Sequence, residues 1–240
     1  MTKIFAISDT HGLHDRFTGS LSIPECDILI HAGDATNKGQ LWELEEFLRW
    51  FSSLDQVKHK VYVPGNHDFG TQEKRSDFRE ILPSNIKYLV DESVELEGIK
   101  IHGTPWTPFF YDWAWNGIEE RGGEGLGYEG GPGWGATPDK DHPLLRDAYG
   151  KIPKDTEILV CHGPPRLDNL DITLEYKKVG SYELLERCRK LNNLIAGICG
   201  HIHEGRGSSG FNGAVWYNVA SCNRAYQLVH EPVEISLQRN

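Results

Sequence analysis

Short apolar runs that each end in a polar cluster are the feature that most restricts how this chain can fold. Residues 3–8, 27–31, 60–63, 157–161 and 194–199 contain Ile, Leu or Val, and the clusters D-T-H, G-D, G-N-H-D, H-G-P-P and G-H-I-H follow them in that order. In open α/β sheets, ligands bind beyond the carboxyl ends of the strands. We therefore expect all five clusters to meet at one edge of the strands.

Helical patterns lie between several of these predicted strands. Residues 40–54 place Leu41, Leu44, Leu48 and Phe51 at helical spacing. The other expected elements are helices at 73–82 and 181–191, the latter with Ser181 as N-cap, a hairpin of 94–96 with 99–102, and strands at 86–90, 215–219 and 226–230. This alternation predicts an α/β fold and a single domain over residues 1–240.

One segment, residues 103–153, interrupts the alternation. It contains Trp106, Trp113, Trp115 and Trp134 and a glycine-dense stretch at 122–135. A loop of this length inside a compact domain is usually functional or disordered. We predict that this insertion shapes a substrate pocket and takes no part in the chemistry.

Composition excludes several classes of protein. The formal net charge of −10 argues against a broad surface for duplex nucleic acid. No apolar run approaches the roughly 20 residues of a membrane helix. The start, MTKIFAISDT, has no pattern of a secretion signal. The five cysteines form no C-x-x-C pair, so we expect free thiols and a cytoplasmic protein.

The polar clusters offer a specific set of metal ligands. Carboxylate, amide oxygen and imidazole suit Mn, Fe, Zn or Ni, and the set is too large for one transition metal, so it predicts two ions that share a carboxylate. Two such ions can clamp a phosphoryl group. His67, next to the amide ligand, is the candidate general acid. The candidate ligands are Asp9, His11, Asp34, Asn66, His162, His201 and His203.

The five clusters, in this order, resemble those of the calcineurin-like metallophosphoesterase superfamily. Within it, the chain is most similar to the metallophosphoesterase-domain-containing proteins, as shown by PWTPFF at 105–110, DWA at 112–114, HGPP at 162–165 and GHIHEG at 200–205. The resemblance implies two packed mixed β-sheets flanked by helices, with His67 as the catalytic histidine. It also implies one metal on Asp9, His11, Asp34 and His203, and a second on Asp34, Asn66, His162 and His201, with manganese favoured.

The resemblance further implies hydrolysis of small phosphodiesters, such as cyclic nucleotides, by a metal-bridging hydroxide. Many relatives carry a second acid three residues after the bridging aspartate, where this chain has Asn37. We therefore expect Asp68 or the backbone to orient His67. We predict Asn37, Trp106 and Arg206 as substrate contacts, since arginine is favoured at phosphate sites and aromatic faces stack on bases.

Three alternatives remain open. A phosphomonoesterase would use the same chemistry. A non-heme iron oxygenase needs two histidines and one carboxylate, which leaves four candidate ligands unexplained. A non-catalytic binding module on this fold would be expected to lack ligands, and none is missing here. About two ions per chain would favour a phosphoesterase, and one iron would favour the oxygenase.

Overall fold

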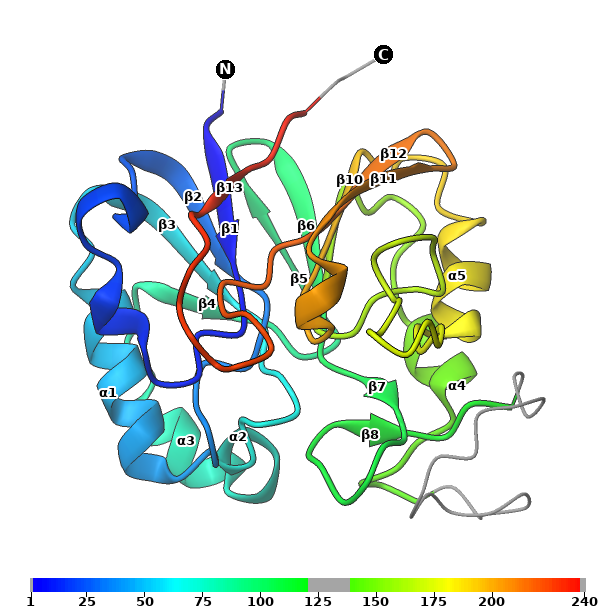
Figure 1. Cartoon of the computed structure of the whole chain (residues 1–240), viewed down its shortest axis with the longest axis horizontal. Helices are drawn as coiled ribbons and strands as arrows, with labels where there is room; N and C mark the ends of the chain where they lie inside the picture. The colour runs from blue at the N-terminus through cyan, green and yellow to red at the C-terminus, as the bar shows by residue number, and fades with distance from the viewer. Residues whose placement is uncertain (1, 121–138, 238–240) are drawn as a thin grey trace.

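Two mixed β-sheets form the centre of the computed structural model, which describes residues 2–120 and 139–237 (Figure 1). The N-terminal sheet has the order β13-β1-β2-β3-β4, and the C-terminal sheet has the order β11-β12-β10-β9-β6-β5. The strands of the N-terminal sheet are β1 (Ile4–Ile7), β2 (Cys26–His31), β3 (Val57–Tyr62), β4 (Ile86–Tyr88) and β13 (Val233–Glu234). Those of the C-terminal sheet are β5 (Glu92–Leu96), β6 (Ile99–Thr104), β9 (Ile158–Cys161), β10 (Ala196–Cys199), β11 (Gly207–Phe211) and β12 (Ala214–Asn218).

The central strands of both sheets are parallel. β1, β2, β3 and β4 run in one direction in the N-terminal sheet, as do β6, β9, β10 and β12 in the C-terminal sheet. Antiparallel strands β13, β11 and β5 lie at the edges. Parallel strands bring their carboxyl ends to the same edge of a sheet, so the polar clusters that follow them are brought together.

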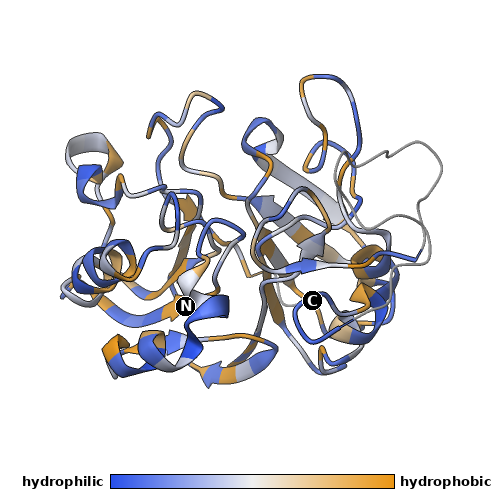
Figure 2. Cartoon of the chain, turned by 90° about the horizontal axis from the view of Figure 1, so that it is seen from below, coloured by the Kyte–Doolittle hydropathy of each residue, from blue (hydrophilic) through white to orange (hydrophobic). Residues whose placement is uncertain are grey.

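Three apolar layers hold the sheets and helices together. The central layer joins residues such as Ile30 and Val61 of one sheet to Ile101 and Ile198 of the other. α1 (Leu41–Ser52) and α3 (Arg75–Ile81) cover the outer face of the N-terminal sheet, and α4 (Leu145–Gly150) and α5 (Tyr182–Cys188) cover that of the C-terminal sheet. Hydrophobic residues run through the strands and alternate with hydrophilic ones along the helices (Figure 2). Burial on both faces explains the continuous apolar runs of the parallel strands.

Most of the predicted elements are present, and the predicted fold class is confirmed. The Ser181 hydroxyl accepts a hydrogen bond of 3.1 Å from the Leu184 N–H and caps α5, as predicted. The helix predicted at 73–82 is present as α3, which begins at Arg75 because Lys74 has a non-helical backbone, and an additional short helix, α2 (Gly70–Glu73), precedes it. The strand predicted at 226–230 is wrong: this region contains one isolated bridge, between Cys222 and Leu228.

The insertion contains more regular structure than the sequence pattern indicates. β7 (Thr107–Pro108) pairs with β8 (Asn116–Gly117), and α4 packs against α5. The pair β7–β8 and the edge strands β11 and β13 had no distinct signal, because they are short or glycine-rich. The glycine-dense stretch at 122–135 lies outside the described residues, so its predicted role stays a prediction. The remaining short elements are the 3₁₀ helices η1 (His14–Arg16), η2 (Gly19–Leu21) and η3 (His203–Gly205).

No helix within residues 2–120 and 139–237 combines the length and apolar character that a bilayer crossing requires. All five cysteines are buried and unpaired, as predicted.

Candidate metal centre

The loops that follow β1, β2, β3, β9 and β10 meet between the two sheets. Within the N-terminal sheet, the Asp9 N–H donates to the Gly33 carbonyl over 2.8 Å. Between the sheets, the His201 N–H donates to the Asp9 carboxylate over 3.0 Å, and His162 Nδ1 lies 2.9 Å from the Ala32 carbonyl. These hydrogen bonds hold side chains that are up to 192 residues apart in the chain within one centre.

The structure brings all seven predicted ligands together in two groups. Nitrogen and oxygen atoms of Asp9, His11 and His203 lie within 4.8 Å of one another, and so do those of Asp34, His162 and His201. Asn66 joins the second group, with its Oδ1 2.9 Å from His162 Nε2.

Asp34 connects the two groups. Its Oδ1 lies 3.3 Å from His162 Nε2, and its Oδ2 lies 3.9 Å from His11 Nε2. One carboxylate oxygen therefore faces each group, as a shared ligand must.

Four of the predicted ligands have a backbone conformation that side chains with a Cβ rarely adopt. The φ angles are 53° at Asp9, 44° at His11, 54° at Asp34 and 66° at His201. Such conformations cost about 1–3 kcal/mol each and concentrate at functional sites, where the surrounding structure holds them. The strain here falls on the residues that carry the ligand atoms.

Close packing explains why glycine precedes three of the predicted ligands, at Gly33, Gly65 and Gly200. A Cβ on Gly33 would lie 2.3 Å from His162 Nδ1, and a Cβ on Gly65 would lie 2.2 Å from Asp34 Oδ1. Both distances are shorter than atoms tolerate. Each side chain larger than hydrogen would therefore displace a ligand.

We expect Gly65→Ala to reduce the metal content of the protein and to lower its free energy of unfolding by about 1–3 kcal/mol, the usual cost of overpacking. Elemental analysis and denaturant unfolding measure the two effects. Gly210→Ala is the matched control, because nothing lies within 4 Å of a Cβ at that position of β11. Full metal content in Gly65→Ala would show that the close packing does not position Asp34.

In the metal-free centre, burial and the nearby carboxylates shift the pKa values of the histidines in opposite directions. Burial lowers the pKa of His11 to about 4 and that of His201 to about 3, so both rings are neutral. Burial also acts to lower the pKa of His162 and His203, but Asp34 and Asp9 outweigh it and raise both values to about 9. At neutral pH, each carboxylate is therefore paired with an imidazolium.

These shifts predict that metal binding releases protons. Histidine binds a metal ion as neutral imidazole. Below pH 9, an ion must therefore displace one proton each from His162 and His203. Affinity should rise with pH up to about 9, by roughly tenfold per pH unit for each proton released. Calorimetry in buffers of different ionisation enthalpy counts the protons. Binding without proton release at pH 7 would contradict the assigned pairs.

His67 lies beside Asp34 at the edge of the two groups. Its Nδ1 lies 2.8 Å from the carbonyl oxygen of Asn37, which can only accept, so Nδ1 carries the hydrogen. Its Nε2 lies 4.0 Å from Asp34 Oδ2 and faces the centre. Of the two orienting groups that were predicted, the structure uses the backbone. Asp68 is buried and instead accepts hydrogen bonds from Ala35, Thr36 and Gly65.

The three predicted substrate contacts are placed differently. Asn37 is exposed next to His67, and its side-chain amide donates to the His11 carbonyl over 2.9 Å. Trp106 is 4% exposed and packs in the core against Trp115, so this placement does not fit a substrate contact. Arg206 donates to the carbonyls of Ala220 and Glu231, so two of its N–H groups serve the fold.

Two aromatic residues that sequence reasoning did not assign to the site lie beside it. The Trp113 ring is 4.1 Å from the His67 ring at an interplanar angle of 35°. The Tyr226 ring is 4.6 Å from the His11 ring. Trp113 lies in the DWA motif, which was a usable signal. Tyr226 had none, because its segment was interpreted as a strand.

The residues of the centre fit two divalent cations. Their oxygen and nitrogen atoms are those that such ions prefer. His203 Nε2 lies 3.2 Å from His11 Nε2 and 3.3 Å from Asp9 Oδ1, so three ligand atoms converge on one point. His11 Nδ1 is buried and has no hydrogen-bond partner among the described residues. The nitrogen of His11 that faces the other ligand atoms is Nε2, which lies 3.9 Å from Asp34 Oδ2.

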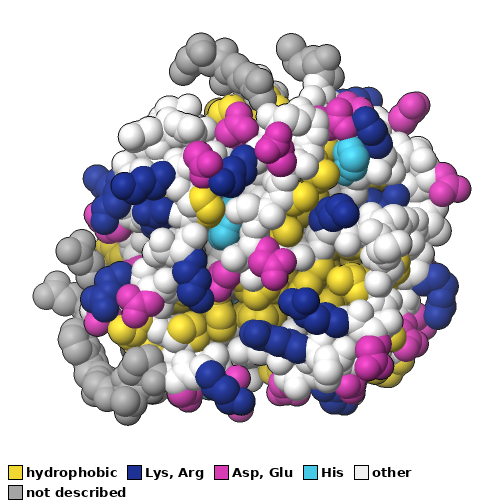
Figure 3. Space-filling view, turned by 180° about the vertical axis from the view of Figure 1, so that it is seen from behind, with side chains coloured by type: hydrophobic (Ala, Val, Ile, Leu, Met, Phe, Trp, Pro, Cys, Tyr) yellow, Lys and Arg dark blue, Asp and Glu magenta, His cyan; other side chains and the backbone are white. Residues whose placement is uncertain are grey.

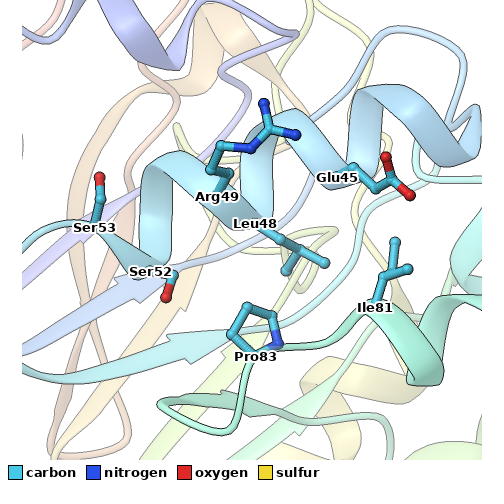
Figure 4. A pocket seen from close by; sticks show the side chains of 7 residues that line it. All are labelled: Glu45, Leu48, Arg49, Ser52, Ser53, Ile81 and Pro83. Atoms are coloured by element: carbon cyan, nitrogen blue, oxygen red, sulfur yellow. The ribbon is translucent and has the colours of Figure 1, made fainter.

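A surface groove between α1 and α3 is separate from this centre (Figure 4). Its lining includes Glu45, Arg49, Ile81 and Pro83, and none of the predicted site residues.

Comparisons with known proteins agree with the geometry. A family model described as calcineurin-like phosphoesterase matches residues 2–205. Metallophosphoesterase domain-containing protein 1 of Homo sapiens is 30% identical over 98% of this chain and 71% of its own length. UPF0046 protein K07C11.7 of Caenorhabditis elegans is 28% identical over 96% of this chain and 73% of its own. The crystal structure of phosphopantetheinyl hydrolase from Mycobacterium tuberculosis has a similar fold, with a TM-score of 0.56 and 18% identity, over 93% of this chain and 90% of that one.

Proposed function

Because the chain belongs to the calcineurin-like phosphoesterase family, a family of metal-dependent phosphoester hydrolases, we propose that its substrates are small phosphodiesters, including cyclic nucleotides. The observation that carries the proposal is the pair of ligand groups that share Asp34, with His67 at their edge. This arrangement suits in-line attack at phosphorus.

Charge favours a diester over a monoester. A phosphomonoester carries up to two negative charges and a diester carries one. Arg206, the cation predicted to meet the phosphate, is partly buried and directs its guanidinium to two backbone carbonyls. Beyond the two ions, the centre therefore gains no charge from Arg206 that would favour the dianionic monoester.

Asp9, His11, Asp34 and His203 would hold one ion, and Asp34, Asn66, His162 and His201 the other, with manganese favoured. When bound, the two ions would lower the pKa of water and neutralise charge on the phosphoryl oxygens. The remaining step is proton transfer to the departing oxygen. His67 is oriented for it, because the Asn37 carbonyl fixes the Nδ1–H and leaves Nε2 toward the centre.

The proposed partners are small molecules. Lys and Arg are interspersed with Asp and Glu on the face seen in Figure 3, and the net charge is −10. This pattern supports neither duplex nucleic acid nor an anionic membrane as a partner. Five buried, unpaired thiols support a reducing compartment, for which we propose the cytoplasm.

A hydrolysis panel tests the proposal. Chelated protein is reloaded separately with Mn, Fe, Zn or Ni and assayed on cyclic nucleotides, linear diesters and monoesters. We expect about two ions per chain and faster turnover of diesters. Faster turnover of monoesters would overturn the diester assignment. Full metal content without hydrolysis of any ester would favour the binding module.

A further inference from the structure

We propose that Tyr226 and Trp113 form an aromatic slot that binds a planar substituent of the substrate, the ester group that is retained during hydrolysis. The inference rests on the proposed function and deepens it, because it identifies the residues that would select diesters carrying an aryl group or a base. The slot is defined here by the rings of Tyr226, His67 and Trp113.

The exposure of the ligands shows from which side a substrate arrives. The side chains of Asp9, Asp34 and His162 are 0%, 3% and 0% exposed, so these residues face the interior. His67 and His203 are 13% and 9% exposed. His201 is also partly exposed, so solvent, and therefore substrate, reaches the centre beside these histidines.

Tyr226 lies on that open side. Its ring centroid is 5.4 Å from that of His203 and 6.3 Å from that of His67, in addition to the contact with His11. The residue is 48% exposed, although its ring touches the centre. An aromatic residue half in solvent and half against catalytic side chains provides rigid contact area for a ligand.

Trp113 also lies against His67. Its ring is tilted by 35° relative to the His67 ring and is partly exposed. Two hydrogen bonds fix the segment: the Ala114 N–H donates to the Asn66 carbonyl over 3.1 Å, and Trp115 Nε1 donates to Thr71 Oγ1 over 3.0 Å. The Trp113 wall of the slot is thus attached to the loop that carries Asn66 and His67.

The loop of Tyr226 is built to hold the ring in place. The Asn223 side chain accepts hydrogen bonds from the N–H groups of Ala225 and Gln227 over 2.9 and 3.1 Å, and the Tyr226 N–H donates to the Asn223 carbonyl over 2.8 Å. The same carbonyl lies 3.0 Å from His203 Nδ1. Tyr226 itself has a φ of 56°, which is an outlier for a bulky side chain. These hydrogen bonds hold the strained backbone and keep the Tyr226 ring against the centre.

Two substrates with the same leaving group isolate the slot. Bis(p-nitrophenyl) phosphate and methyl p-nitrophenyl phosphate both release nitrophenolate, but they retain an aryl and a methyl ester, respectively. The ratio of their kcat/KM values measures recognition of the retained group, and intrinsic reactivity cancels when variants are compared. We expect Tyr226→Leu and Trp113→Leu each to lower this ratio by about tenfold, chiefly through KM of the aryl substrate.

The controls separate the ring from the hydroxyl and from folding. Tyr226→Phe should keep the wild-type ratio, because the ring makes the contact. Tyr176→Leu is a matched control, since Tyr176 also has a positive φ, of 58°, but is 91% exposed. Metal content and the unfolding midpoint are measured for every variant.

An unchanged ratio in Tyr226→Leu and Trp113→Leu that bind metal and still hydrolyse both esters would overturn the slot. A lowered ratio in Tyr226→Phe would overturn the role of the ring. Absence of hydrolysis of either ester by the metal-loaded wild type would instead overturn the proposed function.

Discussion

In Asp34→Ala, we expect neither metal site to be fully occupied. We expect phosphoester turnover to fall by about 10³-fold or more. The two carboxylate oxygens of Asp34 face the two ligand groups. Oδ1 also accepts a hydrogen bond of 2.8 Å from the backbone N–H of His67. The substitution therefore removes a predicted ligand from each group and a hydrogen bond that positions His67, the proposed general acid. Elemental analysis after gel filtration and a diester assay measure the two losses.

Folding must be separated from metal binding in this test. Asp34→Asn keeps the shape of the side chain and should also lose metal, because a neutral amide binds divalent ions more weakly. Asp171→Asn is the matched control: Asp171 is 0% exposed and accepts a 3.1 Å hydrogen bond from Gly180, outside the centre. Two tightly bound ions and normal turnover in a folded Asp34→Ala variant would refute the shared-ligand assignment.

His67→Ala should retain its metal and lose turnover by about 10²–10⁴-fold, the usual contribution of a general acid. The ring is held by Asn37 and contributes its Nε2 to the open side of the centre. The loss should be smallest for nitrophenyl esters, because nitrophenolate leaves without protonation, and largest for alkyl esters.

The comparison of leaving groups decides the role of His67. Equal losses on nitrophenyl and alkyl esters would mean that the ring does not donate the proton. Loss of an ion would mean that His67 acts as a ligand, since its Nε2 lies near His11 and Asp34. His59→Ala is the control, a surface histidine paired with Glu97 over 2.8 Å, and it should change neither quantity.

The strands that carry the ligands were predictable, because they are buried on both faces. Residues such as Ile4, Ile28 and Ile158 are 0% exposed, so their apolar character is a local signal that needs no knowledge of the partner. The polar residues that follow each apolar run were also recognisable, because they contrast with the run before them. The seven candidate ligands were therefore predicted before their distances were known, and the structure brings them close together.

The substrate side was less predictable, because it depends on contacts between distant loops. Trp106 and Trp113 are the same residue type in the same segment, so the sequence does not distinguish them. In the structure, Trp106 is buried and its Nε1 donates a hydrogen bond to Asp91, while Trp113 contacts His67. Arg206 is close in sequence to a ligand, yet backbone carbonyls 14 and 25 residues away hold its guanidinium.

By itself, the sequence determined the fold class and pointed to the candidate ligands and the histidine beside them, since each follows from local apolar patterns and from residue types with few other uses. Only the tertiary structure decided that the Asn37 carbonyl orients His67 and that Tyr226 reaches the centre. Residues 226–230 have the composition of a strand, but the Asn223 side chain holds its neighbours in a turn. Backbone groups make no pattern in a sequence, so the interactions that depend on them appear only when the chain is folded.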